Sequence, residues 1–216
     1  MKILLIGATG MIGSRIAAEA LDRGHQVTAA TRSGRADALP EHPALSGLAL
    51  DASVSGKVDQ AAARHDVVIS AVSPPRDGSD PAVPLLATYT SLIAGLRTAG
   101  VRRLVVVGGA GSLKTASGRD RVDTPDFPEL YKQESLAQRE VLRLLRAEVN
   151  DLDWTYVSPA DEIAPGERTG VFRLGGDELL TAEDGTSFIT AEDYAVALVD
   201  EAEKSTAIRR RITIAY

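Results

Sequence analysis

Three evenly spaced glycines near the start of the chain constrain its fold more than any other feature. They are Gly7, Gly10 and Gly13 in KILLIGATGMIGSRIAAEAL, residues 2–21, where an apolar run meets an amphipathic segment. Gly7 permits a tight turn, Gly10 lets the backbone approach a pyrophosphate, and Gly13 allows a helix to pack closely on the strand. A helix that begins here without a capping side chain offers free N–H groups to a phosphate. We therefore expect a dinucleotide-binding turn rather than a glycine-rich turn that holds no ligand.

Short apolar runs alternate with helix-like segments along the first 160 residues. Continuous apolar runs indicate strands that are covered on both faces, as in a parallel sheet. The segments between them carry apolar residues at helical spacing, most clearly in residues 11–21 and 83–96. This alternation predicts an α/β fold with a doubly wound parallel sheet, the Rossmann fold. The expected strands are 2–7, 25–32, 45–52, 66–73, 102–109 and 153–160.

The last quarter of the chain has a different pattern. Residues 169–180 (TGVFRLGGDELL) are expected to form two short strands joined by a turn, 190–204 a helix and 210–216 a closing strand. No repeat or linker divides the sequence. We therefore expect residues 1–216 to form one NAD(P)-binding domain, with the C-terminal part as a small extension on the substrate side.

Two irregular segments follow the fourth and fifth expected strands. Ligands bind beyond the carboxyl ends of strands in open α/β sheets, so residues 73–84 (SPPRDGSDPAVP) either border the site or form an ordinary connection. The sequence supports both alternatives equally. Residues 113–128 follow the fifth strand and are a candidate for a mobile lid.

The composition excludes several classes of function. The formal net charge is −6, whereas a sequence-independent nucleic-acid binder needs an excess of Lys and Arg on one face. We interpret the basic run Arg209, Arg210 and Arg211 as a solvated strand edge. Because the chain has no cysteine, disulfides, thiol nucleophiles and thiolate metal sites are excluded.

The sequence also lacks membrane and metal signals. No apolar stretch reaches the roughly 18 residues that span a bilayer, so we expect a cytoplasmic protein with no membrane or nucleic-acid partner. His25, His42 and His65 are scattered without ligand spacing, so no metal site is expected. Trp154 begins the sixth strand and is expected to pack in the core rather than stack on a ligand.

The end of the second expected strand favours one nucleotide over the other. NAD sites usually place an Asp or Glu about 20 residues after the glycines, where it binds the ribose hydroxyls. Here AATRSGR carries Arg32, Ser33 and Arg35, with no carboxylate before Asp37. A guanidinium group binds a 2′-phosphate that a carboxylate would repel. We therefore predict NADP as the cofactor, with NADPH preferred over NADH; the alternative is that these arginines only solvate a loop.

With these segments identified, the chain resembles the atypical short-chain dehydrogenase/reductases. The resemblance runs essentially from end to end, through the glycine turn, DVVISAVS, VVVGGAGSL, LDWTYVSPADEIAPGERTGVFRLGGDELL and ITAEDYAVALVDE. Within that group it is similar to the NAD(P)H-flavin reductase family, which is related to flavin/biliverdin reductases and more distantly to NmrA-like proteins. The PGERTG and RLGGD stretches are narrower markers of this family than the glycine turn.

The resemblance implies a set of cofactor-binding residues. Arg32 and Ser33 would lie near the phosphate of the adenosine ribose, and Asp51 and Ala52 would flank the adenine. The pyrophosphate would be held by Gly7, Thr9, Gly10, Met11, Ile12 and Gly13. The second ribose would be lined by Ala71, Val72 and Ser73, and the nicotinamide carboxamide would meet the backbone of Ser158, Pro159 and Ala160.

Ser112, in GGAGS, matches the serine that relatives place beside the nicotinamide ring, so the resemblance implies a catalytic role for it. The alternative is a serine that caps a helix or shapes a loop, which is common after glycines. Its position after the fifth expected strand favours the role in the active site.

The Tyr-Lys pair of ketone reductases is absent from this sequence. A Tyr and a Lys four residues apart share one helix face, where the ammonium group lowers the pKa of the phenol. Tyr89, Tyr131, Tyr156 and Tyr194 are followed four positions later by Ile93, Ser135, Ala160 and Leu198, and Tyr216 is terminal. Reduction of a flavin or another conjugated acceptor does not need this pair, because the ring delocalises the charge and solvent supplies the proton.

Three functions remain after this reasoning. The leading one is an NADPH-dependent reductase that passes hydride to a small planar acceptor such as FMN, FAD or a quinone, as a monomer or small homo-oligomer. The second is an NmrA-like regulator that binds NADP without turnover. A sugar-nucleotide epimerase is disfavoured, because the Tyr-Lys pair is absent and the chain leaves little room for a substrate domain.

Overall fold

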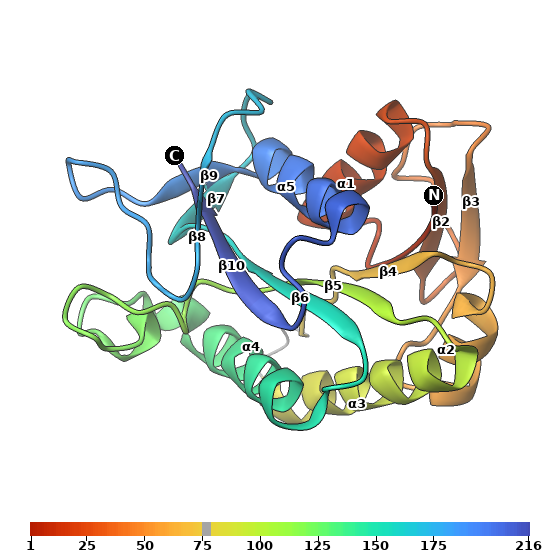
Figure 1. The fold of residues 1–216 in the computed structure, drawn as a ribbon, viewed down its shortest axis with the longest axis horizontal. Helices are drawn as coiled ribbons and strands as arrows, with labels where there is room; N and C mark the ends of the chain where they lie inside the picture. The colour runs from red at the N-terminus through yellow and green to blue at the C-terminus, as the bar shows by residue number, and fades with distance from the viewer. Residues whose placement is uncertain (75–78) are drawn as a thin grey trace.

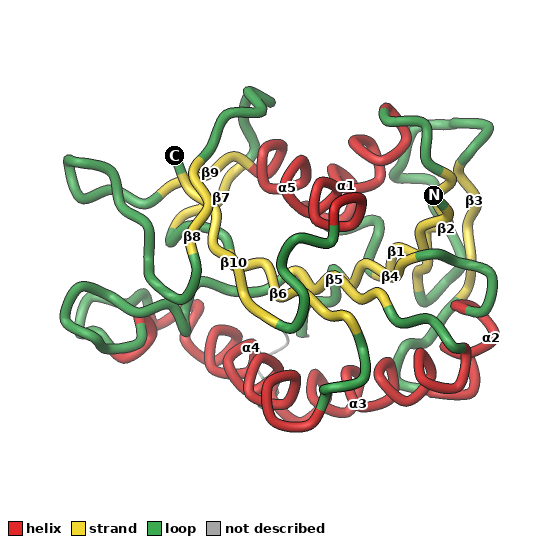
Figure 2. The backbone as a smooth tube through the Cα atoms, viewed as in Figure 1, coloured by secondary structure: helices red, strands yellow, loops and turns green. Residues whose placement is uncertain are grey.

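The computed structural model describes residues 1–74 and 79–216, in which strands and helices alternate along most of the chain (Figures 1 and 2). An eight-stranded sheet has the strand order β3-β2-β1-β4-β5-β6-β10-β8. All described neighbours in it run parallel except β10 and β8. The bounds are β1 Lys2–Ile6, β2 Gln26–Thr31, β3 Leu45–Ala49, β4 Val67–Ser70, β5 Arg103–Val107, β6 Asp153–Ser158, β8 Arg173–Gly175 and β10 Arg210–Ala215. The predicted doubly wound sheet is confirmed.

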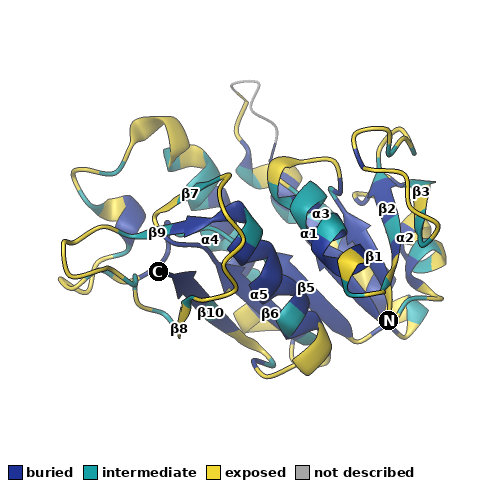
Figure 3. Cartoon of the chain, turned by 90° about the horizontal axis from the view of Figure 1, so that it is seen from above, coloured by how far each residue is buried: buried dark blue, intermediate teal, exposed yellow. Residues whose placement is uncertain are grey.

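Helices cover both faces of the sheet (Figure 1). On one face lie α1 (Met11–Asp22) and α5 (Ala191–Lys204), which pack on each other. On the other lie α2 (Ser55–Ala62), α3 (Ala82–Ala99) and α4 (Glu129–Glu148), and a 3₁₀ turn, η1 (Arg121–Asp123), precedes α4. Helices on both faces require strands that are apolar throughout, which explains why β1 and β4 are buried along almost their whole length. In Figure 3 the strands in the middle of the sheet are mostly dark blue, the colour of buried residues.

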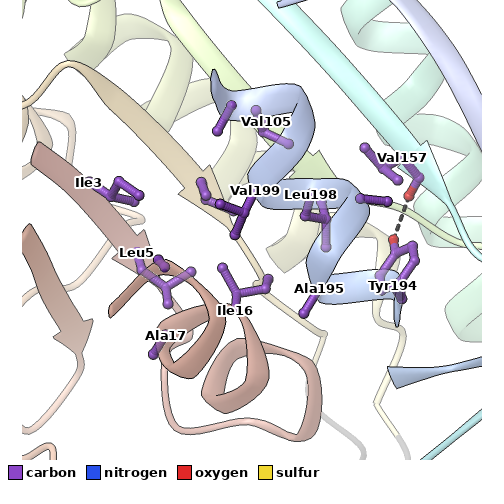
Figure 4. Close-up of a cluster of buried hydrophobic side chains, with 14 of the residues drawn as sticks. Ile3, Leu5, Ile16, Ala17, Val105, Val157, Tyr194, Ala195, Leu198 and Val199 are labelled. Atoms are coloured by element: carbon purple, nitrogen blue, oxygen red, sulfur yellow. Dashed lines mark hydrogen bonds between the residues drawn. The ribbon is translucent and has the colours of Figure 1, made fainter. Parts of the chain in front are cut away.

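The core under α1 and α5 joins the start of the chain to its end. Ile16 of α1 and Leu198 of α5 are fully buried against Leu5 and Val157 of the sheet (Figure 4). The phenol of Tyr194 donates a hydrogen bond of 2.6 Å to the Val157 carbonyl oxygen, so its polar end is satisfied within this core. Each such aliphatic side chain contributes roughly 1.5–3 kcal/mol when buried. The glycine turn is therefore supported by the last helix of the chain.

The second core lies under α2, α3 and α4. Trp154 is 2% exposed there, and its indole N–H donates to the Val149 carbonyl oxygen at 2.8 Å. The prediction that Trp154 packs in the core is confirmed. Tyr89 and Leu92 of α3 and Leu145 of α4 are also buried in this layer.

The C-terminal extension differs from the sequence-based prediction. Residues 169–180 do not form a strand pair; they contribute only β8, which pairs antiparallel with β10. A separate two-stranded parallel sheet joins β7 (Glu162–Ala164) to β9 (Phe188–Thr190), and the sequence reasoning missed it. Both pairings join distant segments, so turn signals within 169–180 carried no information about them.

The interpretation of residues 209–211 as a solvated strand edge is wrong for Arg211. β10 lies between β6 and β8 rather than at an edge, and Arg211 is 4% exposed. Its guanidinium group pairs with Asp177, the closest atoms being 2.7 Å apart. A buried arginine is tolerated here because its charge is paired and its N–H groups are bonded.

Candidate functional site

The glycine turn lies where the strand order reverses, between β1 and β4. Gly7 has a φ of +80°, which favours glycine, and a Cβ atom there would lie 2.4 Å from the Ala71 carbonyl oxygen. A Cβ on Gly13 would lie 2.1 Å from the Gly7 carbonyl oxygen, so the helix approaches the turn as closely as the sequence predicts. Crevices at such a reversal are the usual ligand sites of open α/β sheets.

The first turn of α1 is exposed and has no capping side chain. Gly10 is its N-cap, no side chain caps it, and no acidic residue stands in its first turn. A Cβ on Gly10 would meet nothing closer than the Gly7 carbonyl oxygen at 3.5 Å. Thr9, Gly10 and Met11 are all exposed at this end of the helix. The structure thus leaves free N–H groups, the helix dipole and open space where the pyrophosphate is predicted.

The residues predicted to contact the adenosine part of the cofactor lie just after the ends of β2 and β3. Arg32 and Ser33 are exposed in the turn after β2, and no ion pair between described residues involves Arg32. The Ser53 hydroxyl and amide donate to Asp51 and hold the pKa of that carboxyl below its usual value, with smaller contributions from the charges of Lys57 and Arg32. The charge of Arg32 therefore acts on Asp51 at the predicted adenine position, while its guanidinium group has no ion-pair partner among residues 1–74 and 79–216.

The loop after β4 borders the glycine turn through its first residues. Ala71 donates its amide hydrogen to the Ile6 carbonyl oxygen at 2.8 Å, and Val72 is partly exposed beside it. Ser73 is exposed. The start of the 73–84 segment therefore lies at the site, whereas residues 75–78 lie outside the described part of the chain.

Behind the predicted nicotinamide position, β5 and β6 are locked together at their carboxyl ends. A Cβ on Gly108 would lie 2.1 Å from the Tyr156 ring, and the Gly109 amide donates to the Tyr156 hydroxyl at 3.0 Å. Ser158 donates to the Gly109 carbonyl oxygen at 2.9 Å. The Ser158 side chain is thus used by the fold, which leaves its backbone, with that of Pro159 and Ala160, as the part predicted to meet the carboxamide.

Ser112 lies in a buried polar cluster. It is 8% exposed, and its hydroxyl accepts a hydrogen bond of 2.9 Å from Arg211 Nη1. Arg146 and Arg211 both reach Asp177; burial opposes ionisation of this carboxyl, but the two arginines outweigh it and hold its pKa below the usual range. Because Arg211 donates, the Ser112 hydroxyl keeps its own hydrogen for another acceptor. Its catalytic role stays a prediction.

Tyr131 is a candidate that sequence reasoning missed. Burial raises the pKa of Tyr89 to about 12 and also raises those of Tyr156 and Tyr194, so these three phenols belong to the core. Tyr131, 50% exposed, lies in the first turn of α4, one turn before Ser135. A Cβ on Gly111 would lie 2.6 Å from the Ser135 Cβ, so this helix face adjoins the Ser112 loop. The half-exposed ring therefore lies one helical turn from the residue that adjoins the Ser112 loop.

The PGERTG stretch forms a strap, residues 165–170, across the starts of α1 and α5. Asp193, fully buried, accepts from the amides of Thr169 and Gly170 at 2.9 and 2.7 Å. Glu192 accepts from the Gly166 amide and pairs with Arg15 of α1. A separate ion pair joins Arg168 of the strap to Glu19 of α1 at 2.7 Å. The strap therefore links α1 to α5.

The predicted lid, residues 113–128, is joined to its surroundings. Leu113 and Val122 are buried, and the amides of Arg121 and Val122 donate to the Leu113 and Gly111 carbonyl oxygens at 2.8 Å. The Lys114 amide donates to Asp177. The segment is therefore part of the wall beyond β5, rather than a detached loop.

Two further observations concern metals and membranes. Among the described residues, no cluster of three or more His, Cys, Asp or Glu side chains is arranged to hold a metal ion. His25 bonds to Glu203 and His65 to Thr28. No helix in the described ranges is both long enough and apolar enough to cross a bilayer. The expected cytoplasmic location stays a prediction.

Three solved structures are similar to this chain along its whole length. A Burkholderia pseudomallei protein described as exported is 49% identical with a TM-score of 0.88, and each chain covers 100% of the other. A Bacteroides thetaiotaomicron protein provisionally named an epimerase is 38% identical with a TM-score of 0.90, covering 100% of this chain and 96% of that one. A Streptococcus pneumoniae protein provisionally named an NADH-flavin reductase is 36% identical with a TM-score of 0.81, covering 100% and 99%.

The family assignment rests on most of the chain. The model of a family described as NAD(P)H-binding matches residues 7–210, from the first glycine of the turn to the first residue of β10. The matched region holds every residue predicted to bind the cofactor, in a Rossmann-type fold. The chain therefore belongs to the NAD(P)H-binding family.

Proposed function

We propose that this protein is an NADPH-dependent oxidoreductase that transfers hydride to a flavin or a similar planar, conjugated acceptor. The observation that carries the proposal is the open, uncapped start of α1 at Gly10, directly beside the reversal of strand order. Such a start has unsatisfied N–H groups and a partial positive charge, both of which a pyrophosphate satisfies.

In this proposal the cofactor extends across the carboxyl ends of five neighbouring strands. Arg32 and Ser33 bind the 2′-phosphate, the turn from Gly7 to Gly13 binds the pyrophosphate, and Ser158 to Ala160 bind the carboxamide. NADPH supplies the hydride, and the chain supplies position and electrostatics. This placement of the cofactor is supported by the parallel arrangement of β2, β1, β4, β5 and β6, whose carboxyl ends all lie at the same edge of the sheet.

The acceptor in this proposal is held without a Tyr-Lys acid. Tyr131 presents a half-exposed ring one turn from the contact between Ser135 and the Ser112 loop. An aromatic face at this position stacks on a planar acceptor. Lys132 pairs with Glu129 at 3.2 Å and lies about 100° round the helix from Tyr131, so it does not act with the phenol.

The preference for NADPH rests on Arg32. The Streptococcus relative carries NADH in its name, so the specificity of this chain has to be decided at its own residues. Arg32 is exposed and forms no ion pair with another described residue, and no acidic residue lies between the end of β2 and Asp37; both observations favour a 2′-phosphate over a free 2′-hydroxyl.

A second function is favoured by one observation, the burial of Ser112. A regulator that binds NADP without turnover needs the cofactor site but no reacting hydroxyl, and the Ser112 hydroxyl is 2.9 Å from a structural arginine. The name of the Bacteroides relative points instead to an epimerase, for which this sequence lacks the Tyr-Lys pair.

One assay separates these functions. Purified protein is mixed with NADPH in the presence and absence of flavin, and the loss of absorbance at the reduced nicotinamide band is followed. Flavin-dependent oxidation, faster with NADPH than with NADH, supports the reductase. Tight NADPH binding by titration calorimetry, without oxidation by flavins or a panel of quinones, would refute the reductase and leave the regulator.

A further inference from the structure

A cavity of about 590 Å³ lies beyond the carboxyl ends of β5 and β6. It opens between residues 115–126 and 179–187, whose loops extend from the left end of the molecule in Figure 1. We propose that this cavity binds a neutral, hydroxylated tail of the acceptor, of the ribityl type, while the acceptor ring lies over the nicotinamide. This inference rests on the proposed function and specifies its substrate class.

The walls of the cavity are attached to the two segments that the proposal places at the nicotinamide. On one side, Val122 donates its amide hydrogen to Gly111, the neighbour of Ser112, at 2.8 Å. On the other side, Asp161 follows Ala160 directly, and its amide donates to the Ser187 hydroxyl at 3.1 Å. A ligand that reacts between these segments therefore has the cavity within reach of its substituents.

The lining of the cavity suits hydroxyl groups and not an aromatic ring. Among the described residues that line it, Leu179 is the only large aliphatic side chain, and none is aromatic. Five hydroxyl side chains line it: Thr115, Ser117, Thr124, Thr186 and Ser187. Hydroxyl groups both donate and accept, so such a wall matches a chain of alcohols. A planar ring would find no stacking partner there, which assigns the cavity to the tail.

The hydroxyl groups are held in fixed positions by the fold. The Thr115 hydroxyl lies 3.1 Å from the Arg119 carbonyl oxygen and 3.0 Å from the Ser117 hydroxyl. The Thr186 hydroxyl donates to Asp184 at 2.7 Å. A hydroxyl group that donates to the protein still accepts from a ligand, and acceptors in fixed positions lose little entropy on binding.

The charges around the cavity disfavour a phosphate at the end of that tail. Two guanidinium groups, of Arg119 and Arg121, face three carboxylates, of Asp126, Asp161 and Glu162. Arg121 is already paired, at 2.9 Å with Asp161 and 3.3 Å with Asp126. A phosphate dianion would meet one uncompensated negative charge, whereas a neutral alcohol would not. The structure therefore favours riboflavin over FMN as an acceptor.

Three flavins with the same reacting ring test the assignment. Lumiflavin has a methyl group in place of the tail, riboflavin has the ribityl chain, and FMN adds a phosphate to it. With NADPH at saturation, we expect riboflavin to have the lowest KM, about three- to tenfold below that of lumiflavin, as one or two net hydrogen bonds give. The KM of FMN is expected above that of riboflavin.

Two substitutions in the cavity separate its hydroxyl and charge effects. Ser117→Ala removes an exposed hydroxyl, and we expect it to raise the KM of riboflavin while leaving that of lumiflavin unchanged. Glu162→Gln removes a carboxylate and is expected to lower the KM of FMN towards that of riboflavin. Glu148→Gln, at the far end of α4, is the matched control and is expected to change none of the three values.

The outcomes separate this inference from the function on which it rests. Equal KM values for lumiflavin and riboflavin, with NADPH oxidised by both, would overturn the tail site and keep the reductase. If Ser117→Ala changes the KM of all three flavins by the same factor, the tail site is likewise overturned and the reductase is kept. If none of the flavins oxidises NADPH, flavin reduction is refuted, and the tail site is refuted with it.

Discussion

A Cβ atom on Gly13 would lie 2.1 Å from the carbonyl oxygen of Gly7, whereas one on Gly10 would stand 3.5 Å from that same oxygen. Two glycines of one motif are therefore required for different reasons. Gly13 is required by the packing of α1 on the turn, and Gly10 has space that the protein itself does not fill.

This difference predicts opposite behaviour for two alanine substitutions. Gly13→Ala is expected to destabilise the fold by about 3 kcal/mol or more, because backbone atoms on both sides must move. Gly10→Ala is expected to cost about 1 kcal/mol or less, while it weakens NADPH binding by tenfold or more, because its methyl group occupies the pyrophosphate position. Urea unfolding and calorimetric titration measure the two effects. Unchanged NADPH affinity in folded Gly10→Ala would argue against this pyrophosphate site.

Arg32 is expected to carry the cofactor preference. Arg32→Ala removes the cation expected at the 2′-phosphate, so the KM for NADPH should rise about tenfold while that for NADH stays constant. Arg35→Ala is the control in the same loop, because Arg35 pairs with Asp37 rather than standing free. Steady-state rates with both nucleotides give the comparison. If Arg35→Ala, and not Arg32→Ala, changes the preference for NADPH over NADH, binding of the 2′-phosphate is assigned to Arg35 instead.

Ser112→Ala distinguishes a catalytic serine from a structural one. If the hydroxyl orients the reacting pair, kcat should fall about tenfold with little change in the KM for NADPH. Loss of its bond to Arg211 should also cost about 1.5–3 kcal/mol of stability. Thr213→Val, which removes a buried hydroxyl that donates to Gly176 at 2.7 Å, is the control for stability loss alone. Equal kcat values for the two variants would assign Ser112 to the fold.

Asp193 is expected to make the strap sensitive to acid. Burial opposes ionisation of this carboxyl, but hydrogen bonds from Thr169, Tyr216 and Gly170 outweigh it, so its pKa in the folded state lies below the usual value. Its contribution to the free energy of unfolding is therefore present above the pKa of the unfolded state, about 3.9. The contribution is lost as the pH falls through the lower pKa of the folded state.

The variant Asp193→Asn tests this contribution. It should lower the free energy of unfolding by about 2 kcal/mol at pH 7, and the difference from the natural chain should shrink below about pH 4. Asp184→Asn is the control, since Asp184 bonds to Thr186 in an exposed turn and holds no distant segment. Chemical unfolding from pH 7 to pH 3 gives the curves. A constant difference between the Asp193 variant and the natural chain across this range would contradict the assignment.

Much of the fold was predictable from local sequence pattern. Continuous apolar runs identified the strands β1, β2, β4, β5 and β6, and helical spacing identified α1 and α3. The glycine turn and the burial of Trp154 followed from the same reasoning. These features were predictable because each depends on residues that are close together in sequence. Over such short distances the periodicity of apolar residues indicates which faces of a strand or helix are buried.

The remaining features depend on partners that are distant in sequence. Arg211 looked like a surface residue, yet it is buried, because Asp177 and Ser112, the latter 99 positions away, satisfy its guanidinium group. β8 pairs with β10, and Tyr131 comes to lie near the Ser112 loop through the contact of Ser135 with Gly111. The sequence by itself determined the sheet, the glycine turn and the membership of an NAD(P)H-binding family. Only the tertiary structure decided which charges are buried and which side chains stand near the predicted nicotinamide, because compensation of a charge depends on contacts that no local pattern encodes.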